Sequence, residues 1–376
     1  DRLNHIWAVF IFSIFALIVV LEQFVGDPIH CWCPAEFTDS HCNYTEAYCW
    51  IEDTYYIPND QAVPWEESAR RQDEVKYYPW VPLILVFLAG CFKLPNLIWD
   101  MLNGVTGVNI SKVIETVEES TMAADRRLKI EFVANYLDKW LFHSRKLSYG
   151  TLYKLFESLS SFMCFCFGQG TVSFITGLYI LIKFCYLCVA VTLLFLLNKV
   201  LAMNYTIYGW EVLDNLINGE ELVESSRFPR VTLCDFQIRQ LQNIQTYSVQ
   251  CLLSVNLFNE KIFIFTWFWL VALSILNLFA WLSALNAFSL PCSRRKWIRT
   301  HMDAMRRKSH DEVKEQFIMF LGIDGIFLLR LIEDNSSEIT IADIILELWR
   351  LFNKRGRISS TPDVGQYIQT LRFHHE

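Results

Sequence analysis

The chain has 376 residues and a formal net charge of −7; 53% of its residues are hydrophobic, 15% are aromatic and only 19% are charged. A soluble protein of this length spreads its apolar residues as periodic stripes, but here they form uninterrupted blocks. This composition excludes an ordinary soluble domain and indicates an integral membrane protein.

Four apolar blocks are long enough to cross a bilayer as helices, which takes about 20 residues each. They cover residues 6–24, 80–99, 171–197 and 262–288. The first block could be a secretory signal, but residues 21–26 offer no small-residue cleavage site, so we predict a retained span. The second helix is expected to start near Trp80, because prolines flank that position and proline suits only the first turn of a helix. Since the sequence starts at Asp1 and not at methionine, we expect a further N-terminal segment.

Charge sets the orientation of the four spans. Loops 25–79 and 198–261 must share one side of the membrane, and segments 100–170 and 289–376 share the other. The first pair carries 3 and 5 Lys/Arg, and the second pair carries 8 and 14. Because basic residues concentrate on the cytosolic side, the first pair is predicted to be extracellular and the second pair cytoplasmic.

Cysteine usage agrees with this topology. Six cysteines lie in the predicted outer loops, and disulfides form outside the cell and not in the reducing cytosol; they are Cys31, Cys33, Cys42, Cys49, Cys234 and Cys251. The C-x-x-C spacing of Cys185 and Cys188 lies in an apolar span without a second ligand pair, so we expect no zinc site. Cys164, Cys166 and Cys292, near the inner boundary, fit either palmitoylation or small interfacial hydrophobes.

Charged groups at the spans and outer loops raise two further questions. Lys183 lies inside the third span and should face either a protein interior or a water-filled lumen. Loop 25–79 carries 11 Asp/Glu against 3 Lys/Arg, which would concentrate cations at an aqueous mouth or simply form a solvated acidic surface. Glu22 and Asp27 sit where the first span emerges, so they are candidates for the outer part of a pore.

The cytoplasmic segments are expected to be helical. In segment 100–170 apolar residues recur near helical spacing among charges, and in the tail a capping box at 340–343 is predicted to open a helix. The stretch from Lys354 is expected to be flexible. We find no nucleotide-binding glycine loop, no metal-ligand spacing among the histidines and no catalytic constellation. Neither an enzyme activity, a cofactor, a metal nor a nucleic-acid partner is therefore expected.

Several short motifs lie at the ends of the predicted spans and in the cytoplasmic tail. Asp1-Arg-Leu-Asn4 precedes the first span and Gly26-Asp-Pro-Ile-His-Cys-Trp32 follows it. Tyr77-Tyr-Pro-Trp-Val-Pro82 is similar to the innexin signature Tyr-Tyr-Gln-Trp-Val-Pro, with proline in place of glutamine. Leu94-Pro-Asn-Leu-Ile-Trp99 and Gly322-Ile-Asp-Gly-Ile-Phe-Leu-Leu-Arg330 extend the match, so the resemblance to the innexin family covers nearly the whole chain.

The resemblance implies a fold and a function. The fold is an all-α membrane protein with four transmembrane helices, disulfide-linked extracellular loops and a helical cytoplasmic domain. The function is that of a subunit in a homo- or hetero-oligomeric ring of eight innexins in the plasma membrane. Such a ring passes ions and small molecules, either as a hemichannel or docked to a second ring at a cell junction. The alternative from another class is a non-conducting tetraspan adhesion or scaffold protein.

The family pattern also implies a disulfide arrangement. Innexins carry two cysteines in each outer loop, which pair here as Cys31 with Cys251 and Cys49 with Cys234. Cys33 and Cys42 are surplus to that pattern and are expected to form a third, local bridge, or to remain free thiols.

Two sequons, Asn43-Tyr-Thr45 and Asn204-Tyr-Thr206, lie in the outer loops and are predicted to be glycosylated, whereas those at Asn109 and Asn335 are cytoplasmic. A glycan on Asn43 would oppose docking and favour hemichannels.

Overall fold

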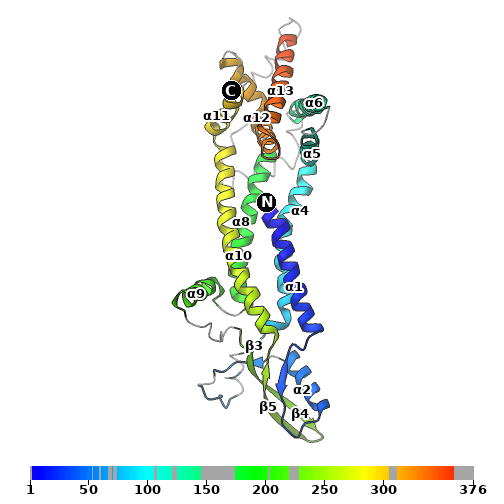
Figure 1. The fold of residues 1–376 in the computed structure, drawn as a ribbon, viewed down its shortest axis with the longest axis vertical. Coiled ribbons are helices and arrows are strands. Elements are labelled where there is room, and N and C mark those ends of the chain that lie inside the picture. The colour runs from blue at the N-terminus through cyan, green and yellow to red at the C-terminus, as the bar shows by residue number, and fades with distance from the viewer. Residues whose placement is uncertain are drawn as a thin grey trace. The chain divides into compact units, whose positions relative to one another are not determined.

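The computed structural model describes residues 2–52, 54–58, 61–66, 70, 74–105, 108–120, 125–144, 174–201, 204–219, 228–304 and 311–359. The chain forms two compact units. The first unit comprises Asp1–Asn96 and Cys185–Leu278, and the second comprises Leu97–Phe184 and Phe279–Glu376. Figure 1 shows the helices and strands of both units.

In the part of the chain that the structure describes, four helices are long and apolar enough to cross a membrane, which agrees with the predicted number of spans. The first joins η1 (Leu3–Ala8) to α1 (Val9–Phe24), and the second joins η3 (Tyr78–Trp80) to α4 (Val81–Val105). The third is α8 (Phe174–Val200), and the fourth joins α10 (Val255–Ala284) to η4 (Leu285–Ser289). Residues 171–173, which the sequence assigned to the third span, lie outside the described residues.

The helices extend beyond the apolar blocks from which the sequence predicted them. The fourth begins at Val255 and not at residue 262, because polar residues of its first turns are buried against protein partners. Asn256 donates to Pro229 O at 2.8 Å, and Glu260 pairs with Arg230 at 3.1 Å. The second helix starts at Val81, next to the expected Trp80, after a 3₁₀ turn that holds Pro79.

The outer loops build a five-stranded antiparallel sheet that the sequence did not predict. The strand order is β1-β5-β4-β2-β3. The long hairpin of β4 (Val231–Gln240) and β5 (Asn243–Leu252) forms its centre. The three short strands from the first outer loop are β1 (His30–Trp32), β2 (Thr54–Tyr55) and β3 (Glu74–Val75). The two outer loops are thus interleaved in one sheet.

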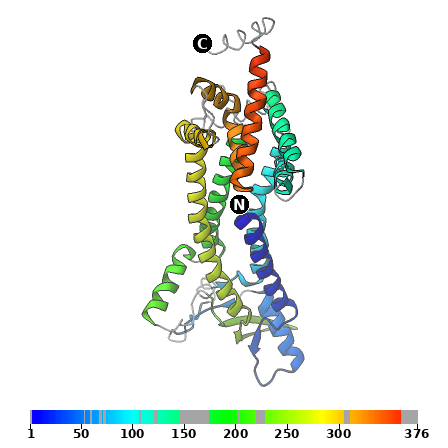
Figure 2. The ribbon, with the colours of Figure 1, turned by 45° about the horizontal axis from the view of Figure 1, so that its top comes forward.

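Helix α2 (Asp39–Ile51) lies beside this sheet, as Figures 1 and 2 show. Along β4 the residues Thr232, Cys234 and Phe236 alternate as buried positions, which is the period of a strand with one covered face. Aromatic rings fill the space next to α2: the ring of Tyr48 lies 5.9 Å from that of Phe236. The sheet and α2 therefore share a small apolar core.

The cytoplasmic segments fold into helices, as the sequence predicted. They are α5 (Ile110–Ser120), α6 (Arg126–Ser144), α11 (Pro291–Ala304), α12 (Asp311–Asp334) and α13 (Glu338–Ser359). Helices α6 and α13 lie side by side (Figures 1 and 2), and an ion pair between Arg126 and Asp343 at 2.9 Å joins them. Buried apolar residues of these helices form one core with the inner ends of the spans.

The predicted helix start in the tail is wrong. Helix α13 begins at Glu338 and not at residue 340, and its cap is Ser337, whose hydroxyl accepts the Thr340 N–H at 3.3 Å. The buried Thr340 hydroxyl is hydrogen-bonded to the Ser337 hydroxyl at 2.9 Å, so it belongs to the first turn and does not form the predicted box. The helix also continues to Ser359, past the expected flexible boundary at Lys354; residues 360–376 lie outside the described part.

Candidate functional site: the bridged extracellular cap and the inner ends of the spans

Three disulfides hold the outer loops, and we call the sheet, α2 and these bridges the extracellular cap. Cys31 on β1 is bonded to Cys251 on β5, across a separation of 220 residues, and the two residues are also paired in the sheet register. Cys49 on α2 is bonded to Cys234 on β4. The structure therefore pairs the same cysteines as the family pattern, and it ties each outer loop to the other twice.

The third bridge, between Cys33 and Cys42, closes a short loop of the first outer segment, with a separation of nine residues. It fixes the strand end at β1 to the first turn of α2. The sulfurs of Cys31, Cys49 and Cys251 lie within 4.8 Å of one another. Since all three are bonded in disulfides and thiolates are the form that binds metals, this cluster is a crossing of two bridges.

Hydrogen bonds fasten the cap to the outer ends of the spans. Gln23 Nε2, at the end of α1, donates to Tyr78 O at 2.9 Å, and the Tyr78 hydroxyl donates to Cys49 O at 3.3 Å. Ser254 Oγ, just before α10, donates to Asp27 O at 2.7 Å. The point where the first span emerges is therefore linked to both the second and the fourth spans.

The two residues predicted near a pore differ in exposure at this point. Glu22 is half-buried in the last turns of α1, and Asp27 is exposed just beyond that helix. The Asp27 backbone is fixed by Ser254, so its carboxylate is carried on an anchored segment.

Asp235 joins the second outer loop to the first. Its carboxylate accepts a hydrogen bond from the Tyr55 hydroxyl at 3.0 Å and another from Ser248, and it pairs with Arg70 at 3.1 Å. Burial, and then the charge of Asp235, raise the pKa of Tyr55 far above its ordinary value. The tyrosine therefore stays protonated and acts as a donor, and one acid of the outer face is neutralised by arginine.

The predicted glycosylation sites lie on water-accessible positions. Asn43 is exposed on α2, whereas Thr45 of the same sequon is fully buried and its hydroxyl donates to His41 O at 2.9 Å. Asn204 is exposed at the N-cap of α9 (Tyr205–Asn218), directly after the third span.

Comparison with known proteins decides the family. The innexin family model matches residues 1–352. The chain belongs to the innexin family. It is 33% identical to innexin unc-9 of Caenorhabditis elegans over 95% of this chain and 93% of that protein. It is 34% identical to innexin-3 of the same organism over 95% of this chain and 83% of that one. A third relative is innexin-19 of Caenorhabditis briggsae, at 29% identity over 95% and 86%.

Family membership settles the general role. Innexins are gap-junction and channel proteins that assemble with other innexin subunits, so this chain is a channel subunit in that general sense. With four membrane-spanning helices it is a multi-pass protein of the plasma membrane at cell junctions. The predicted family, fold class and location are thereby confirmed.

Inside the membrane, this innexin pairs two buried asparagines. Asn4 Nδ2 donates to Asn277 Oδ1 at 2.7 Å, and Asn277 Nδ2 donates back to Asn4 Oδ1 at 3.1 Å. The Asn277 amide also lies 3.4 Å from Tyr186 O. Such amide contacts between helices hold spans together where apolar contact gives little preference. The first, third and fourth spans are thus joined at one polar point.

At the inner end of the third span, Asp324 of α12 caps α8. The buried carboxylate accepts the Thr176 N–H at 3.0 Å, the Thr176 hydroxyl at 2.7 Å and the Ile175 N–H at 3.3 Å. The first N–H groups of a helix have no partner within the helix, so an acid here satisfies them. Burial raises the pKa of Asp324 to about 6, although these hydrogen bonds act in the opposite direction.

At the inner end of the fourth span, Arg330 of α12 donates two hydrogen bonds to backbone carbonyls. Its guanidinium donates to Ala287 O at 3.1 Å and to Ser293 O at 3.3 Å. It also lies over the rings of Phe288 and Trp297, at 5.4 and 5.3 Å from their centres. Because the last carbonyls of a helix lack partners, this arginine closes the end of the fourth span.

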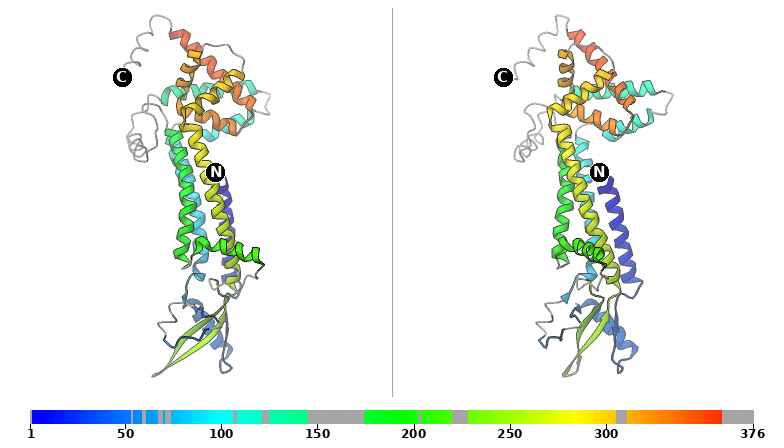
Figure 3. Two further views of the ribbon diagram at one scale, coloured as in Figure 1. Left: turned by 90° about the vertical axis from the view of Figure 1, so that its left-hand side faces the viewer. Right: turned by 60° about the vertical axis from the view of Figure 1, so that its left-hand side comes forward.

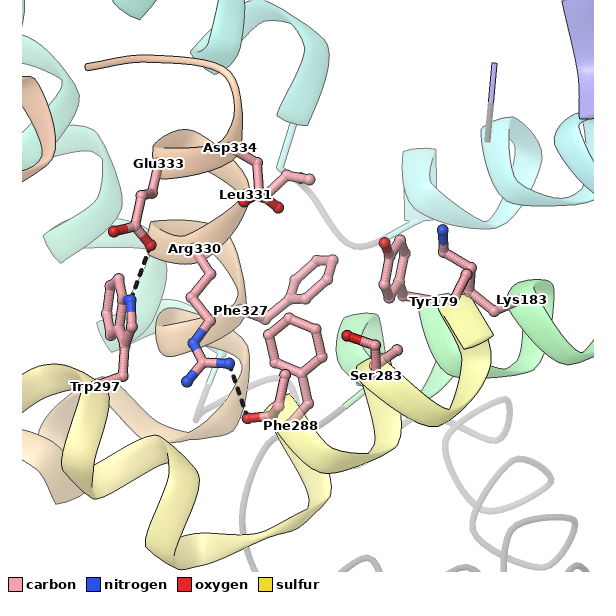
Figure 4. A pocket seen from close by; sticks show the side chains of 13 residues that line it. Tyr179, Lys183, Ser283, Phe288, Trp297, Phe327, Arg330, Leu331, Glu333 and Asp334 are labelled. Carbon is pink, nitrogen blue, oxygen red and sulfur yellow. Dashed lines mark hydrogen bonds between the residues drawn. The ribbon is translucent and has the colours of Figure 1, made fainter. Parts of the chain in front are cut away.

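A cavity of about 450 Å³ lies beside Arg330, between the inner ends of the third and fourth spans. Figure 4 shows Tyr179 and Lys183 on the side of the cavity opposite Arg330 and Trp297. Lys183 Nζ lies 5.2 Å from the centre of the Tyr179 ring. Lys183 is half-buried and lines this cavity.

The cysteines outside the cap divide by exposure. Cys91 and Cys185 are half-buried free thiols, whereas Cys188 and Cys292 are exposed. Cys164 and Cys166, which the sequence placed near the inner boundary, lie outside the described residues.

Proposed function

We propose that this innexin assembles into a ring of eight subunits around a wide pore that passes ions and small molecules. Each span bonds its backbone internally as a helix, and four helices from one chain are too few to enclose a wide lumen. A pore must therefore come from several chains arranged about an axis. Large exposed apolar side chains along the first span, such as Phe10 and Leu17, leave surface that neighbouring chains or lipid must cover.

The extracellular cap is the observation that carries the proposal. Ordering a mobile loop during association costs affinity, and the cap is ordered beforehand by its bridges, its sheet and its bonds to the ends of the spans. A surface of this kind suits docking between two rings on neighbouring cells. A scaffold protein could use the same surface for recognition, so conduction is the property that separates the two functions.

Single-channel recording tests the proposal. We expect unitary openings in the membrane of a cell without junctions of its own, and image classes of the purified assembly with eight-fold symmetry. A protein that reaches the surface with its bridges intact but gives no unitary conductance is the scaffold alternative.

We further propose that Glu22 and Asp27 line the outer part of the pore and favour cations. Their support is their position, where the first span emerges and where hydrogen bonds fix the backbone. Substituting both, Glu22→Gln with Asp27→Asn, should shift the reversal potential in a salt gradient toward lower cation preference. Glu52→Gln, at the far end of α2, is the matched control. An unchanged reversal potential in the double variant contradicts the assignment.

We also propose that Asn43 and Asn204 are glycosylated and that the glycan on Asn43 favours undocked hemichannels. A bulky hydrated group on the exposed face of α2 opposes close apposition of two caps. Asn43→Gln should raise junctional conductance between paired cells while leaving hemichannel current unchanged, and Asn204→Gln serves as the control sequon. Strong junctional current from wild-type protein with Asn43 fully glycosylated would contradict this proposal.

A further inference from the structure

Helix α9 begins where the third span leaves the membrane. The Thr206 N–H donates to Asn198 Oδ1, in the last turns of α8, at 2.9 Å. This bond fixes the first turn of α9 to the end of the span. Figure 3 shows α9 leaving α8 at a steep angle to both α8 and α10. The helix therefore runs across the direction of the spans and not along it.

The position of α9 is set by its contacts with the fourth span. The Tyr205 hydroxyl donates to Phe263 O at 2.6 Å, and Trp267 Nε1 donates to Thr206 O at 3.1 Å. Gly209 sits against the Trp267 ring, and a Cβ added there would lie 2.0 Å from it. Phe263 and Trp267 both belong to the apolar stretch of α10. These contacts place α9 beside Phe263 and Trp267, at the outer end of the predicted fourth span.

Away from α10, this helix exposes a row of apolar side chains. Consecutive residues are rotated by roughly 100° about a helix axis, so Trp210, Leu213 and Ile217 share a side. We call these three residues the α9 stripe. Trp210 is 66% exposed and Ile217 is 80% exposed. Glu211 and Asn215 lie on a different side, at least about 100° from each residue of the stripe by the same rotation, whereas the exposed Asp214 borders the stripe next to Trp210.

We infer that the α9 stripe lies in the outer leaflet, where its side chains sit between the headgroups and the acyl chains. A helix fixed beside the outer end of a span, with a row of exposed apolar side chains, fits the membrane–water boundary, and tryptophan is enriched there. The stripe also continues the exposed apolar surface at the outer end of α8, where Phe195 and Val200 are exposed.

Charge identifies the lipid class. Helix α9 carries Glu211 and Asp214 and no lysine or arginine. Anionic headgroups would be repelled by these acids, so the partner is a zwitterionic surface such as phosphatidylcholine. The stripe thus acts as a fixed lipid anchor beside the extracellular cap.

Photo-crosslinking in the assembled protein tests this inference. A benzoylphenylalanine replaces Ile217 in one variant and Asn215, away from the stripe, in the control, and each assembly is placed in phosphatidylcholine nanodiscs. We expect irradiation to attach a phospholipid, detected by peptide mass, at least several-fold more often at position 217 than at 215. Ile217 is largely exposed, so its replacement disturbs no packed contact. The same probe at Trp210 provides a second site if the first variant does not assemble.

Three results would overturn the inference. They are a crosslink between two chains as the main product, equal lipid yields at positions 217 and 215, and no lipid adduct at either site of the stripe. Replacing part of the phosphatidylcholine by phosphatidylserine should leave the yield unchanged or lower it, and an increase would refute the assigned lipid class. The inference rests on the spans and not on conduction, so recordings from the same variants test the proposed channel separately.

Discussion

Replacing Asp324 by asparagine is expected to change the pH dependence of thermal unfolding. The Asp324 side chain is only 2% exposed, and burial raises its pKa from 3.8 to about 6. The folded protein therefore binds this proton more tightly than the unfolded chain does. The effect favours the folded state fully below about pH 4 and is lost as the pH rises through about 6.

The size of this effect on stability follows from the pKa shift of Asp324. A difference of about two pKa units corresponds to about 3 kcal/mol of unfolding free energy, since one unit is about 1.36 kcal/mol. Above pH 7 the wild-type protein holds a buried charge that costs about this amount. The substituted asparagine is an uncharged side chain of the same shape, and its oxygen can still accept the Thr176 N–H. Its NH₂ group would face the other donors, which adds a constant cost of about 1–3 kcal/mol.

The test is therefore how the difference in stability between the wild type and the variant changes with pH, and not how large that difference is at one pH. The melting temperature of each assembly in nanodiscs is measured from pH 5 to pH 8 for the wild type and for Asp324→Asn. We expect the wild type to gain stability relative to the variant as the pH falls. Thr176→Val is the matched control: it removes the hydroxyl that favours the charged carboxylate, so the titration should move to higher pH. A difference in melting temperature that stays constant across this range refutes the reasoning.

Three further perturbations address other contacts. Removing the local bridge by Cys33→Ser with Cys42→Ser should cost about 2–3 kcal/mol in thermal unfolding, the loop entropy of a nine-residue separation, and no loss would show that these thiols are free. Asn277→Leu should cost about 1–2 kcal/mol by leaving the Asn4 amide unpaired, whereas adding Asn4→Leu should recover much of it; two additive losses would contradict the pairing. Arg330→Lys should cost about 1–3 kcal/mol, because an ammonium cannot reach both carbonyls and stack on two rings, and wild-type stability would refute the capping role.

The spans and their orientation were predictable because both depend on local composition. Uninterrupted apolar blocks show where helices cross, and the basic residues beside them show which side is cytosolic. The start of the fourth helix was not predictable. Asn256 and Glu260 look like the residues of an aqueous loop, and they are helical because Pro229 O and Arg230 satisfy them within the fold.

The extracellular sheet was missed for a similar reason. Strands β1, β2 and β3 have three, two and two residues, too few for a periodic signal. The alternation of buried Thr232, Cys234 and Phe236 along β4 is the pattern of a strand with one covered face. The pattern ends there, because the far end of the same hairpin is exposed. The cysteines indicate which segments of the outer loops meet better than strand propensity does, because Cys31 and Cys251 are direct neighbours in the sheet.

At the inner ends of the third and fourth spans, the charge of each bound side chain is opposite to the partial charge of the helix terminus. Helix α12 places Asp324 at the start of α8, where unpaired N–H groups give the helix its positive end. Six residues later it places Arg330 on Ala287 O, where unpaired carbonyls give the fourth span its negative end. One cytoplasmic helix thus supplies an anion and a cation to two antiparallel spans, each with the sign that its terminus requires. Asp324 and Arg330 thus attach α12 to the inner ends of both the third and the fourth spans.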